Sequence, residues 1–305
     1  MSVHPRAEAT ALLVGESLVD IVRGRDGVTQ EYAGGSAANS AVALARLGRP
    51  VHFVTAFTPD RLGTIVRAHL ERDGVRFAAD PAAIDHTSSA VATIGPDGAA
   101  SYVFDLEWQI NAATDLGEPW VIHTSSLAAV VEPGATQVAA LIAGLRARAT
   151  VSYDINARPS ITGTGPDVVA AVERMAALAD VVKCSDEDLD ALYPQLDHPA
   201  AARHLIALGP TIVVVTAGGE GASWFTAAAA GHVPSVSVEV ADTIGAGDTF
   251  GAAIVDALWE RGALGGRLPA LSADDWSAVL SYAARVAAVT VSRPGADPPY
   301  RHELG

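Results

Sequence analysis

Apolar residues in the first quarter of the chain follow two alternating patterns. Residues 10–14 and 51–57 form short, almost continuous apolar runs, which are typical of strands buried on both faces. Residues 36–47 and 58–72 carry apolar side chains at helical spacing, and the first of these helices is expected to stop at Gly48. Strands that alternate with helices predict an α/β fold with a mostly parallel central sheet flanked by helices.

This alternation is interrupted between residues 77 and 107. Two strand-like runs there flank a Gly-Pro-Asp-Gly sequence at 95–98, which predicts an antiparallel hairpin. The hairpin is expected either to form a small sheet that serves as a lid or to be a surface excursion without function. We expect one domain over residues 1–305, with lid segments at about 15–35 and 77–110.

The alternation resumes after residue 120. A buried strand is expected from about residue 121, and a helix should follow it through about residue 148. No internal repeat and no low-complexity linker interrupts the rest of the chain. Further strands are predicted at 149–156, 179–185, 210–219, 223–227 and 233–240, and further helices at 248–261 and 274–289.

The charge of the chain limits its partners. Its 305 residues include 35 acidic and 20 basic side chains, for a formal charge of −15. Such a field repels nucleic acid and anionic membrane surfaces, so we expect neither as a partner. No stretch is apolar for the roughly 20 residues that a membrane helix requires, and the single cysteine, Cys184, excludes an intrachain disulfide. These features predict a soluble protein of the cytoplasm.

A glycine-rich turn before the predicted helix at 248–261 carries candidate chemistry. Gly245, Ala246 and Gly247 are small residues that lead directly into the helical pattern. Such a turn points free N–H groups outward at the positive end of the helix dipole, so it predicts a site for a transferring phosphate. Asp248 follows at this end. It either caps the helix, which its local surroundings favour, or accepts a proton beside the phosphate.

Other motifs for phosphate binding, metal binding and hydrolysis are absent from the sequence. There is no GxxxxGK[ST] sequence, and the only lysine, Lys183, is followed by Cys184. No GxGxxG fingerprint follows the first strand, and neither an HExxH zinc motif nor a GxSxG nucleophile turn occurs. What remains is a phosphate-handling α/β enzyme without a P-loop.

Two widely separated motifs resemble the signatures of one family. Residues 34–39 (GGSAAN) and 242–248 (DTIGAGD) are similar to the N-terminal and C-terminal signatures of ribokinase-like (PfkB) carbohydrate kinases. The resemblance implies a ribokinase-like fold with a small β lid, which transfers the γ-phosphate of ATP to a sugar hydroxyl. It also implies that Asp248 is the general base and that the N–H groups of residues 245–247 stabilise the transferring phosphoryl.

The resemblance further implies where the sugar binds. Asp20, Gly34, Gly35 and Asn39 match sugar-contacting positions of the family, where glycines let a hydroxylated ring approach the backbone. The alternative roles are structural: Asp20 would end a strand, the two glycines would make a turn and Asn39 would cap a helix. These roles are compatible with sugar binding. The DINARP sequence resembles a DPNxR element of fructokinase-like and ketodeoxygluconate kinase-like members. This resemblance makes Arg158 a candidate for contact with substrate or phosphate. The alternative is an ordinary arginine on the surface.

Positions for the nucleotide follow from the same resemblance. Thr216, Gly218 and Gly221 form a TxGxxG turn that is similar to the turn near ATP in relatives, although a plain β-turn would have the same sequence. Lys183 is counted with them as a nucleotide contact. Many relatives carry an asparagine near the adenine, and Ala284 stands at the matching position, so contacts with the base are expected to be mostly apolar.

Two metal positions are implied as well. The family's NxxE element, which organises magnesium through water, reads SDED here, so either Asp188 or Glu187 would serve the metal. A solvated acidic helix start is the alternative. Asp242 and the SRPGADP sequence resemble elements that hold a monovalent cation in some relatives, which adds potassium to the expected cofactors ATP and magnesium.

The leading interpretation is a cytoplasmic kinase for fructose or a related ketose or keto-sugar acid. The GES, DINARPS, SDED and SRPGA sequences together are most similar to those of fructokinases, with ketodeoxygluconate kinases next. A nucleoside kinase would share both signatures, and a non-catalytic sugar or nucleotide sensor would share the fold. Strand edges in the lid also predict a homodimer, because exposed edges favour pairing.

Overall fold

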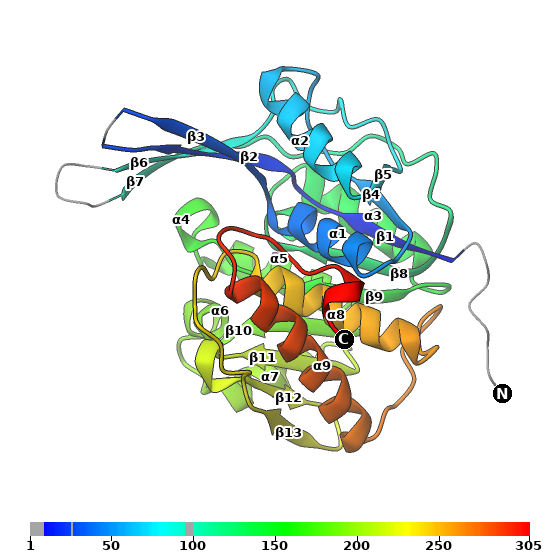
Figure 1. Ribbon diagram of the computed structural model, residues 1–305. Helices are drawn as coiled ribbons and strands as arrows, with labels where there is room; N and C mark the ends of the chain where they lie inside the picture. Colours follow the sequence, from blue (N-terminus) through cyan, green and yellow to red (C-terminus); the bar gives the residue numbers. More distant parts are fainter. Residues whose placement is uncertain (1–8, 26, 95–99) are drawn as a thin grey trace.

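The computed structural model describes residues 9–25, 27–94 and 100–305, and one large sheet runs through its centre (Figure 1). Neighbouring strands in this sheet are parallel except at one edge, where the last two strands join antiparallel. The expected mostly parallel α/β fold is confirmed. In spatial order the strands are β13 (Ala230–Val233), β12 (Ala222–Phe225), β11 (Ile212–Thr216), β10 (Val181–Ser185), β9 (Thr150–Asp154), β8 (Glu118–Ser125), β1 (Ala9–Val14), β4 (Val51–Val54) and β5 (Arg76–Phe77).

Helices cover both faces of the large sheet because its strands are apolar on both sides. In β1, Leu13 packs with the helices of one face, whereas Leu12 and Val14 pack with those of the other. One face carries α1 (Ser36–Arg46), α2 (Arg61–Arg72), α8 (Ala246–Glu260) and α9 (Ala273–Val291); the other carries α3 (Gly134–Leu145), α5 (Pro166–Ala176), α6 (Asp186–Leu192) and α7 (His198–Ala207). The short helix α4 (Pro159–Thr162) follows β9.

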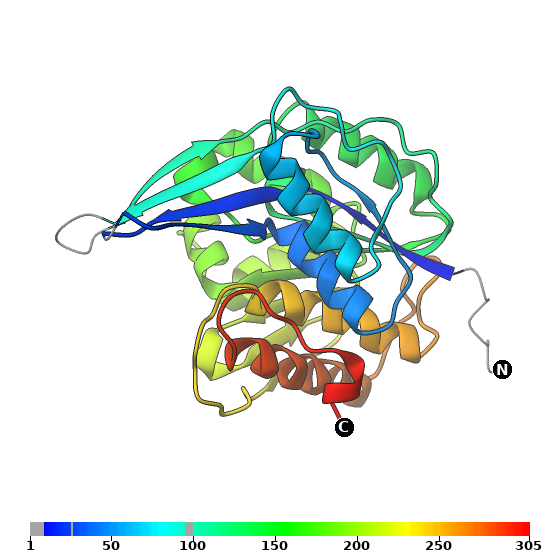
Figure 2. The ribbon, with the colours of Figure 1, turned by 45° about the horizontal axis from the view of Figure 1, so that its top comes forward.

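A second, four-stranded sheet projects from the body of the molecule (Figure 2). Its order is β3 (Thr29–Gly34), β2 (Leu18–Arg23), β6 (Ser89–Ile94) and β7 (Ala100–Asp105). β6 and β7 are antiparallel, as the predicted hairpin requires, although the turn at 95–98 lies outside the described residues. β2 and β6 pair in parallel, so two chain segments from different parts of the sequence make one sheet.

The predicted strand at 233–240 is wrong. β13 ends at Val233, and residues 234–240 belong to no strand. Their alternating valines imitate an edge strand, but Val236, Val238 and Val240 line a cavity instead of a sheet face. The two helices predicted near the end of the chain are present with slightly different bounds. α8 begins at Ala246, two residues before its expected start, and α9 extends one residue before and two residues beyond its expected bounds.

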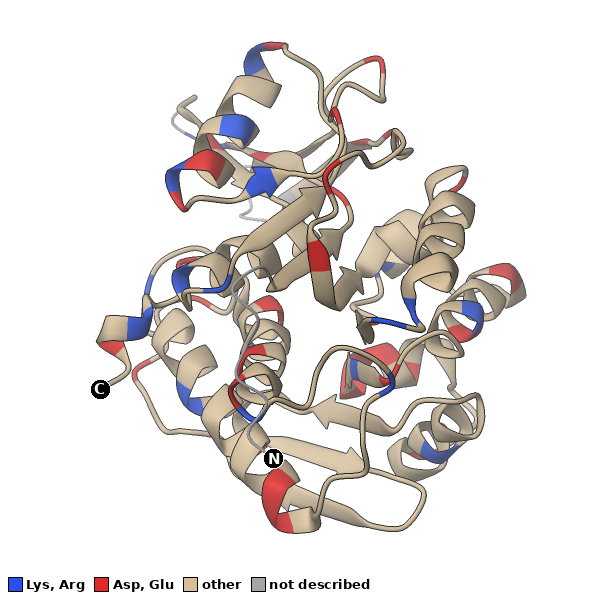
Figure 3. Cartoon of the chain, turned by 90° about the vertical axis from the view of Figure 1, so that its right-hand side faces the viewer, with Lys and Arg blue, Asp and Glu red and all other residues tan. Residues whose placement is uncertain are grey.

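Along the ribbon drawn in Figure 3, basic residues are interspersed with acidic ones. None of the described helices combines the length and apolar character that crossing a membrane would demand.

α1 lies very close to the end of β1, which brings its first turn beside α8. A Cβ atom added to Gly15 would lie 2.3 Å from the Cβ of Ala37 and 3.4 Å from that of Ala128. Ala37, Ala38 and Ala41 on α1 are almost fully buried. The first turns of α1 and α8 therefore meet at the carboxyl end of the parallel strands, where open α/β sheets bind their ligands.

We expect Gly15→Ala to lower the free energy of unfolding by about 1–3 kcal/mol, because its methyl group would overlap α1. Gly144→Ala is the matched control. Gly144 is an exposed residue of α3 with no atom within 4 Å of an added Cβ, so its replacement should be neutral or raise stability by up to about 1 kcal/mol. Urea unfolding of both variants would measure the difference, and equal effects would contradict the close approach at Gly15.

Candidate active site

Asp248 is the third residue of α8, and the residue is only 6% exposed. Oδ1 accepts a hydrogen bond from Ser36 Oγ at 2.7 Å and a longer one from Asn156 Nδ2 at 3.3 Å. Oδ2 accepts from Asn39 Nδ2 at 2.8 Å. All three donors lie outside α8, so the carboxylate holds other segments in place and does not act as a helix cap.

The hydroxyl of Ser36 is the centre of this network. Its Oγ lies 2.8 Å from Ser125 Oγ and accepts a hydrogen bond from Asn156 Nδ2 at 2.8 Å. A hydroxyl has a single proton, so while Ser36 donates to an ionised Asp248, Ser125 must donate to Ser36. The arrangement fills Oδ1 of Asp248 with two donors and leaves one lone pair open on Oδ2.

Sequence reasoning did not identify Ser36, Ser125 or Asn156 as site residues. Ser36 lies inside the GGSAAN motif, which offered a signal. Asn156 has a backbone φ of 39°, a conformation that asparagine tolerates better than most residues. This turn after β9 aims the Asn156 amide at Asp248.

The turn before α8 has the features of an anion site. Gly245 adopts a φ of 73°, and a Cβ atom there would lie 2.7 Å from that of Ala296. Ala246 N donates to the Thr243 carbonyl at 3.2 Å, whereas within the described chain the Gly247 N–H has no such backbone partner outside the helix. The end of the helix dipole adds positive potential at this turn.

The only lysine of the chain lies beside the same turn. Lys183 Nζ, on β10, would be 2.9 Å from a Cβ atom added to Gly247. It also donates to Asp154 Oδ2 at 2.9 Å, and both side chains are buried. Burial opposes the charge, but Asp154, Asp188 and Asp248 together raise the pKa of Lys183, so a fixed ammonium charge stands next to the first turn of α8.

Three of the five expected sugar-binding residues line one large groove, whereas Gly35 and Arg158 are not among its lining residues. Asp20, Gly34 and Asn39 line a cavity of about 1190 Å³ between the small sheet, α2 and the segment near Pro294. Asp20 lies in the middle of β2, not at a strand end, and burial raises the pKa of its carboxyl. Asn39 lies within α1 and does not cap it.

The two neighbouring glycines of this motif are required by close contacts. A side chain at Gly34 would meet Asp20 Oδ2 at 2.4 Å, and one at Gly35 would meet the Glu16 carbonyl at 2.7 Å. Gly35 also has a φ of 103°, which favours glycine. Arg158 is exposed and donates to Asn156 Oδ1 at 2.5 Å. Burial raises the pKa of both Glu16 and Asp20, and the charge of Arg158 offsets part of this rise.

Glu16 is a buried acid that sequence reasoning missed. It is 6% exposed, and its Oε1 accepts the N–H of Ser36 at the start of α1 at 3.1 Å. Its Oε2 is buried and has no hydrogen-bond partner among the described residues. Burial raises the pKa of Glu16 to about 7, and the nearby charge of Asp248 raises it as well. The GES sequence at the end of β1 was the available signal.

Three of the four expected nucleotide residues line a second cavity, of about 480 Å³, next to α9, whereas Lys183 is not among its lining residues. Thr216, Gly218 and Gly221 form one of its sides, and Ala284 lies on α9 as the sequence suggested. Gly221 has a φ of 100°, and a side chain there would collide with the Val233 carbonyl at 2.2 Å. The cavity also includes Ala246 and Gly247, so it ends at the anion site.

The expected metal residues are placed differently from one another. Asp188 is 6% exposed, and its Oδ1 and Oδ2 accept the N–H groups of Ala157 and Ser185, each at 2.7 Å. It therefore ties the DINARP turn to the start of α6. Glu187 is exposed beside it. The described part of the chain has no group of three or more His, Cys, Asp or Glu side chains arranged for a metal.

Asp242 joins two loops at the edge of the site. Its Oδ1 accepts the N–H of Ile244 at 3.0 Å, and its Oδ2 accepts that of Gly295 at 2.9 Å. These backbone hydrogen bonds lower the pKa of its carboxyl, which therefore stays charged. The SRPGADP sequence and the glycine-rich turn are thus held together by Asp242.

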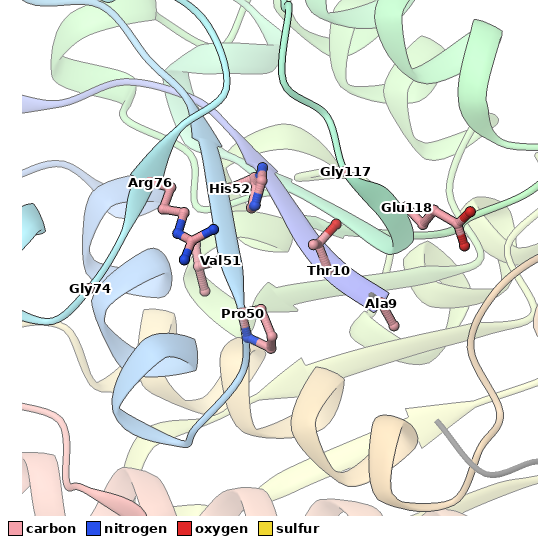
Figure 4. Close-up of a pocket in the computed structure, with 9 residues that line it drawn as sticks. All are labelled: Ala9, Thr10, Pro50, Val51, His52, Gly74, Arg76, Gly117 and Glu118. Carbon is pink, nitrogen blue, oxygen red and sulfur yellow. The ribbon is translucent and has the colours of Figure 1, made fainter. Parts of the chain in front are cut away.

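Another cavity, of about 540 Å³, lies at the opposite end of the sheet (Figure 4). It is lined by residues near the amino ends of β1, β4, β5 and β8, including Thr10 and His52. The side chains of Thr10 and His52 are already engaged, since His52 Nδ1 lies 2.8 Å from the Asp115 carbonyl and Thr10 donates to that of Leu116. This end of a parallel sheet is not where such folds place their chemistry.

The buried carboxyl of Glu16 predicts a dependence of stability on pH. Because its pKa in the folded protein is about 7 and its ordinary value is 4.5, the unfolded chain ionises first as pH rises between these values. Stability should therefore fall over this window, by about 3 kcal/mol once pH exceeds 7. In Glu16→Gln the part of this fall that Glu16 causes should be lost, so stability should fall less steeply than in the wild type. Asp154, whose pKa burial also raises to about 7, keeps its own contribution. Urea unfolding at pH 5, 6, 7 and 8 would show it, and parallel curves for both proteins would contradict the raised pKa.

Comparisons with known proteins give the family of the chain. The model of the pfkB family of carbohydrate kinases matches residues 12–303. A fructokinase of Rhizobium leguminosarum bv. trifolii is 38% identical over 260 residues, which are 81% of this chain and 79% of that protein. An aminoimidazole riboside kinase of Salmonella typhimurium is 28% identical over 249 residues, 78% of this chain and 77% of that one.

Solved structures give the same result. A fructokinase from Xylella fastidiosa with bound ATP superposes with a TM-score of 0.78 at 25% identity, and the match covers 96% of this chain and 97% of that one. The ribokinase-like fold and its similarity to fructokinases are confirmed, and the chain is a phosphotransferase that acts on a sugar hydroxyl. With both signatures meeting at Asp248 and the family model matching nearly its whole length, the chain belongs to the pfkB family of carbohydrate kinases.

Proposed function

We propose that this kinase transfers the γ-phosphoryl group of ATP to a hydroxyl of fructose or of a related ketose or keto-sugar acid. The observation that carries the proposal is the position of Asp248. Its carboxylate lies at the positive end of α8, next to Asn39 on the sugar groove and Gly247 on the nucleotide cavity. A base between an acceptor site and a phosphate site is what phosphoryl transfer to an alcohol needs.

In this proposal the open lone pair on Asp248 Oδ2 receives the proton of the sugar hydroxyl. Ser36 and Asn156 keep Oδ1 engaged, so the carboxylate cannot rotate away. The hydroxyl oxygen then attacks the γ-phosphorus, and ADP leaves with the electron pair of the broken P–O bond. The N–H groups of the turn before α8 and the ammonium of Lys183 stabilise the charge on the transferring phosphoryl.

Magnesium fits the site through water and phosphate oxygens, since Mg²⁺ needs few protein ligands. Glu187 is exposed and free to hold such waters, while Asp188 retains one lone pair on each oxygen beyond its backbone contacts. The ion would neutralise charge on the β- and γ-phosphates. We further propose a monovalent cation, potassium, beside Asp242, whose charged carboxylate already joins the two loops.

Fructose is favoured as the acceptor over a nucleoside because the fructokinase relative is 38% identical, against 28% for the riboside kinase. Asp20 and Asn39 offer acceptors and donors to sugar hydroxyls, and Arg158 lies near enough to offset part of the rise that burial causes in the pKa of Asp20. The engaged carboxylate of Asp248 argues against a sensor that only binds. We place the reaction in the cytoplasm, where ATP is available.

The first experiment measures ADP release with ATP and magnesium for fructose, ketodeoxygluconate, ribose and adenosine. Fructose should be turned over with the highest kcat/KM. Asp248→Asn should keep sugar binding, measured by calorimetry, and lose at least about a hundredfold in kcat, because general-base catalysis contributes roughly 10²–10⁴-fold. Replacing KCl by NaCl should lower the rate if Asp242 holds potassium.

Each outcome has a definite meaning. Adenosine as the preferred acceptor would replace fructose by a nucleoside, and binding of every sugar without turnover would favour a sensor. A fully active Asp248→Asn variant would contradict the role of the base. Equal rates in KCl and NaCl would remove potassium from the proposal.

We also propose that residues 1–305 form one domain whose small sheet is a lid over the sugar groove and the surface of a homodimer. Its edge strands β3 and β7 carry exposed apolar side chains, with Tyr32 52%, Tyr102 60% and Val103 66% exposed. Unpaired edges of this kind favour association.

Light scattering should then report a mass near twice 31.2 kDa at micromolar concentration. Val103→Asp should shift the protein toward the monomer, because a buried charge at the interface is costly. Leu196→Asp, at an exposed residue outside the small sheet, is the matched control and should leave the mass unchanged. A monomeric wild type would remove the dimer from the proposal.

A further inference from the structure

The nucleotide cavity is lined by side chains that have few groups able to distinguish one base from another. Among its lining residues none is charged, and none has an amide or imidazole group. α9 contributes Ala284, Ala287 and Ala288, and the segment opposite contributes Val236, Val238 and Val240. Four hydroxyl groups complete the polar side chains, those of Thr216, Ser235, Ser237 and Thr243.

The direction of the nucleotide follows from the anion site. Ala246 and Gly247 lie at one end of the cavity, where the helix terminus and Lys183 would hold phosphate. The base then lies away from this turn, between the alanines of α9 and the valines of residues 234–240. That slot is apolar on both sides, so the flat faces of a base would bind there by packing.

Recognition of one purine over another depends on the polar edge of the ring. Adenine presents an amino donor and a ring-nitrogen acceptor, whereas guanine and hypoxanthine present a carbonyl acceptor and an N–H donor. A side-chain amide or carboxylate would distinguish the two patterns. A hydroxyl would not, because it donates or accepts as required. Moreover, Thr216 and Ser235 already donate to the carbonyls of Cys184 and Gly219.

The backbone of residues 234–240 can likewise form hydrogen bonds with either pattern of ring edge. The segment belongs to no strand, so its N–H and C=O groups are not committed to a sheet. Each residue other than Pro234 offers one donor and one acceptor, which serves either pattern of ring edge. Packing alone discriminates by roughly 10–200-fold, whereas a site built to hydrogen-bond one partner discriminates by about 10⁴–10⁵-fold.

We infer that this kinase uses purine nucleoside triphosphates broadly, with ITP and GTP as phosphoryl donors besides ATP. The inference rests on the proposed nucleotide site and extends it to a class of donors. Each reaction balances as with ATP: the γ-phosphoryl passes to the sugar oxygen, the sugar proton passes to Asp248, and the corresponding diphosphate leaves. The discrimination is set by the apolar slot and not by the phosphate end, which is common to all three donors.

The test compares kcat/KM for ATP, ITP and GTP with wild-type protein, magnesium and a saturating acceptor sugar. Ratios of ATP to GTP and of ATP to ITP below about 200 are expected, the range that packing can produce. Calorimetry with ADP, IDP and GDP should give dissociation constants that differ by similar factors. Ratios above about 200 for ATP over both ITP and GTP would overturn the inference. They would mean that the backbone of residues 234–240 forms hydrogen bonds specific to adenine.

Ala284→Leu tests whether the slot holds the base. Its larger side chain should weaken ADP, IDP and GDP alike, by about tenfold or more, and leave the KM for the sugar unchanged. Ala143→Leu on the exposed face of α3 is the matched control and should change none of these constants. Unchanged binding of all three diphosphates to Ala284→Leu would overturn the inference, because the base would then lie elsewhere.

These results are separable from failure of the proposed function. If no triphosphate supports turnover of any sugar, the kinase proposal itself fails, and calorimetry on the diphosphates still tests the slot. If ATP alone supports turnover with a preference above the stated limit, the kinase proposal stands and only the broad use of donors is rejected.

Discussion

The hydrogen bonds that hold the Asp248 carboxylate join parts of the chain that are 209 and 212 residues apart. Ser36 and Asn39 stand on the first turn of α1, Asp248 on the first turn of α8, and Asn156 on the turn after β9. α1 borders the sugar groove through Asn39, and α8 borders the nucleotide cavity through Ala246 and Gly247. A single carboxylate therefore sets the distance between the sugar groove and the phosphate end of the nucleotide cavity, and the rest of the α/β scaffold keeps these turns in register.

Small residues make this convergence possible. Gly15 lets α1 approach β1, Gly34 and Gly35 let the chain pass close to Asp20 and Glu16, and Gly245 brings α8 against Ala296. The abundance of alanine in α1 has the same cause, since Ala37, Ala38 and Ala41 are all buried at close helix contacts. Polar groups are then enclosed with little room for water, and this explains why Glu16 is buried with one oxygen unpaired.

Much of the fold was predictable because apolar periodicity reflects burial directly. The alternating strands and helices and the hairpin of β6 and β7 followed from it, and the two signatures identified Asp248 and the glycine turns. The strand expected at 233–240 failed because a row of valines beside a cavity has the same alternation as one on a sheet. Ser36, Ser125 and Asn156 could not be found by periodicity, since their roles depend on contacts between distant segments. Asp188 matched a metal motif, but its hydrogen bonds to backbone N–H groups of Ala157 and Ser185 could not be read from the sequence.

The placement of Lys183 has a consequence for the outside of the molecule. Because it is the only lysine and is buried against Asp154, no ammonium side chain lies on the surface, and every fixed cation there is a guanidinium. Guanidinium groups keep their charge well above pH 10, where ammonium groups lose theirs. The positive part of the surface is therefore constant across the alkaline range. Reagents that modify amino side chains would find their single target next to the phosphate-binding turn, so a bound nucleotide would shield it.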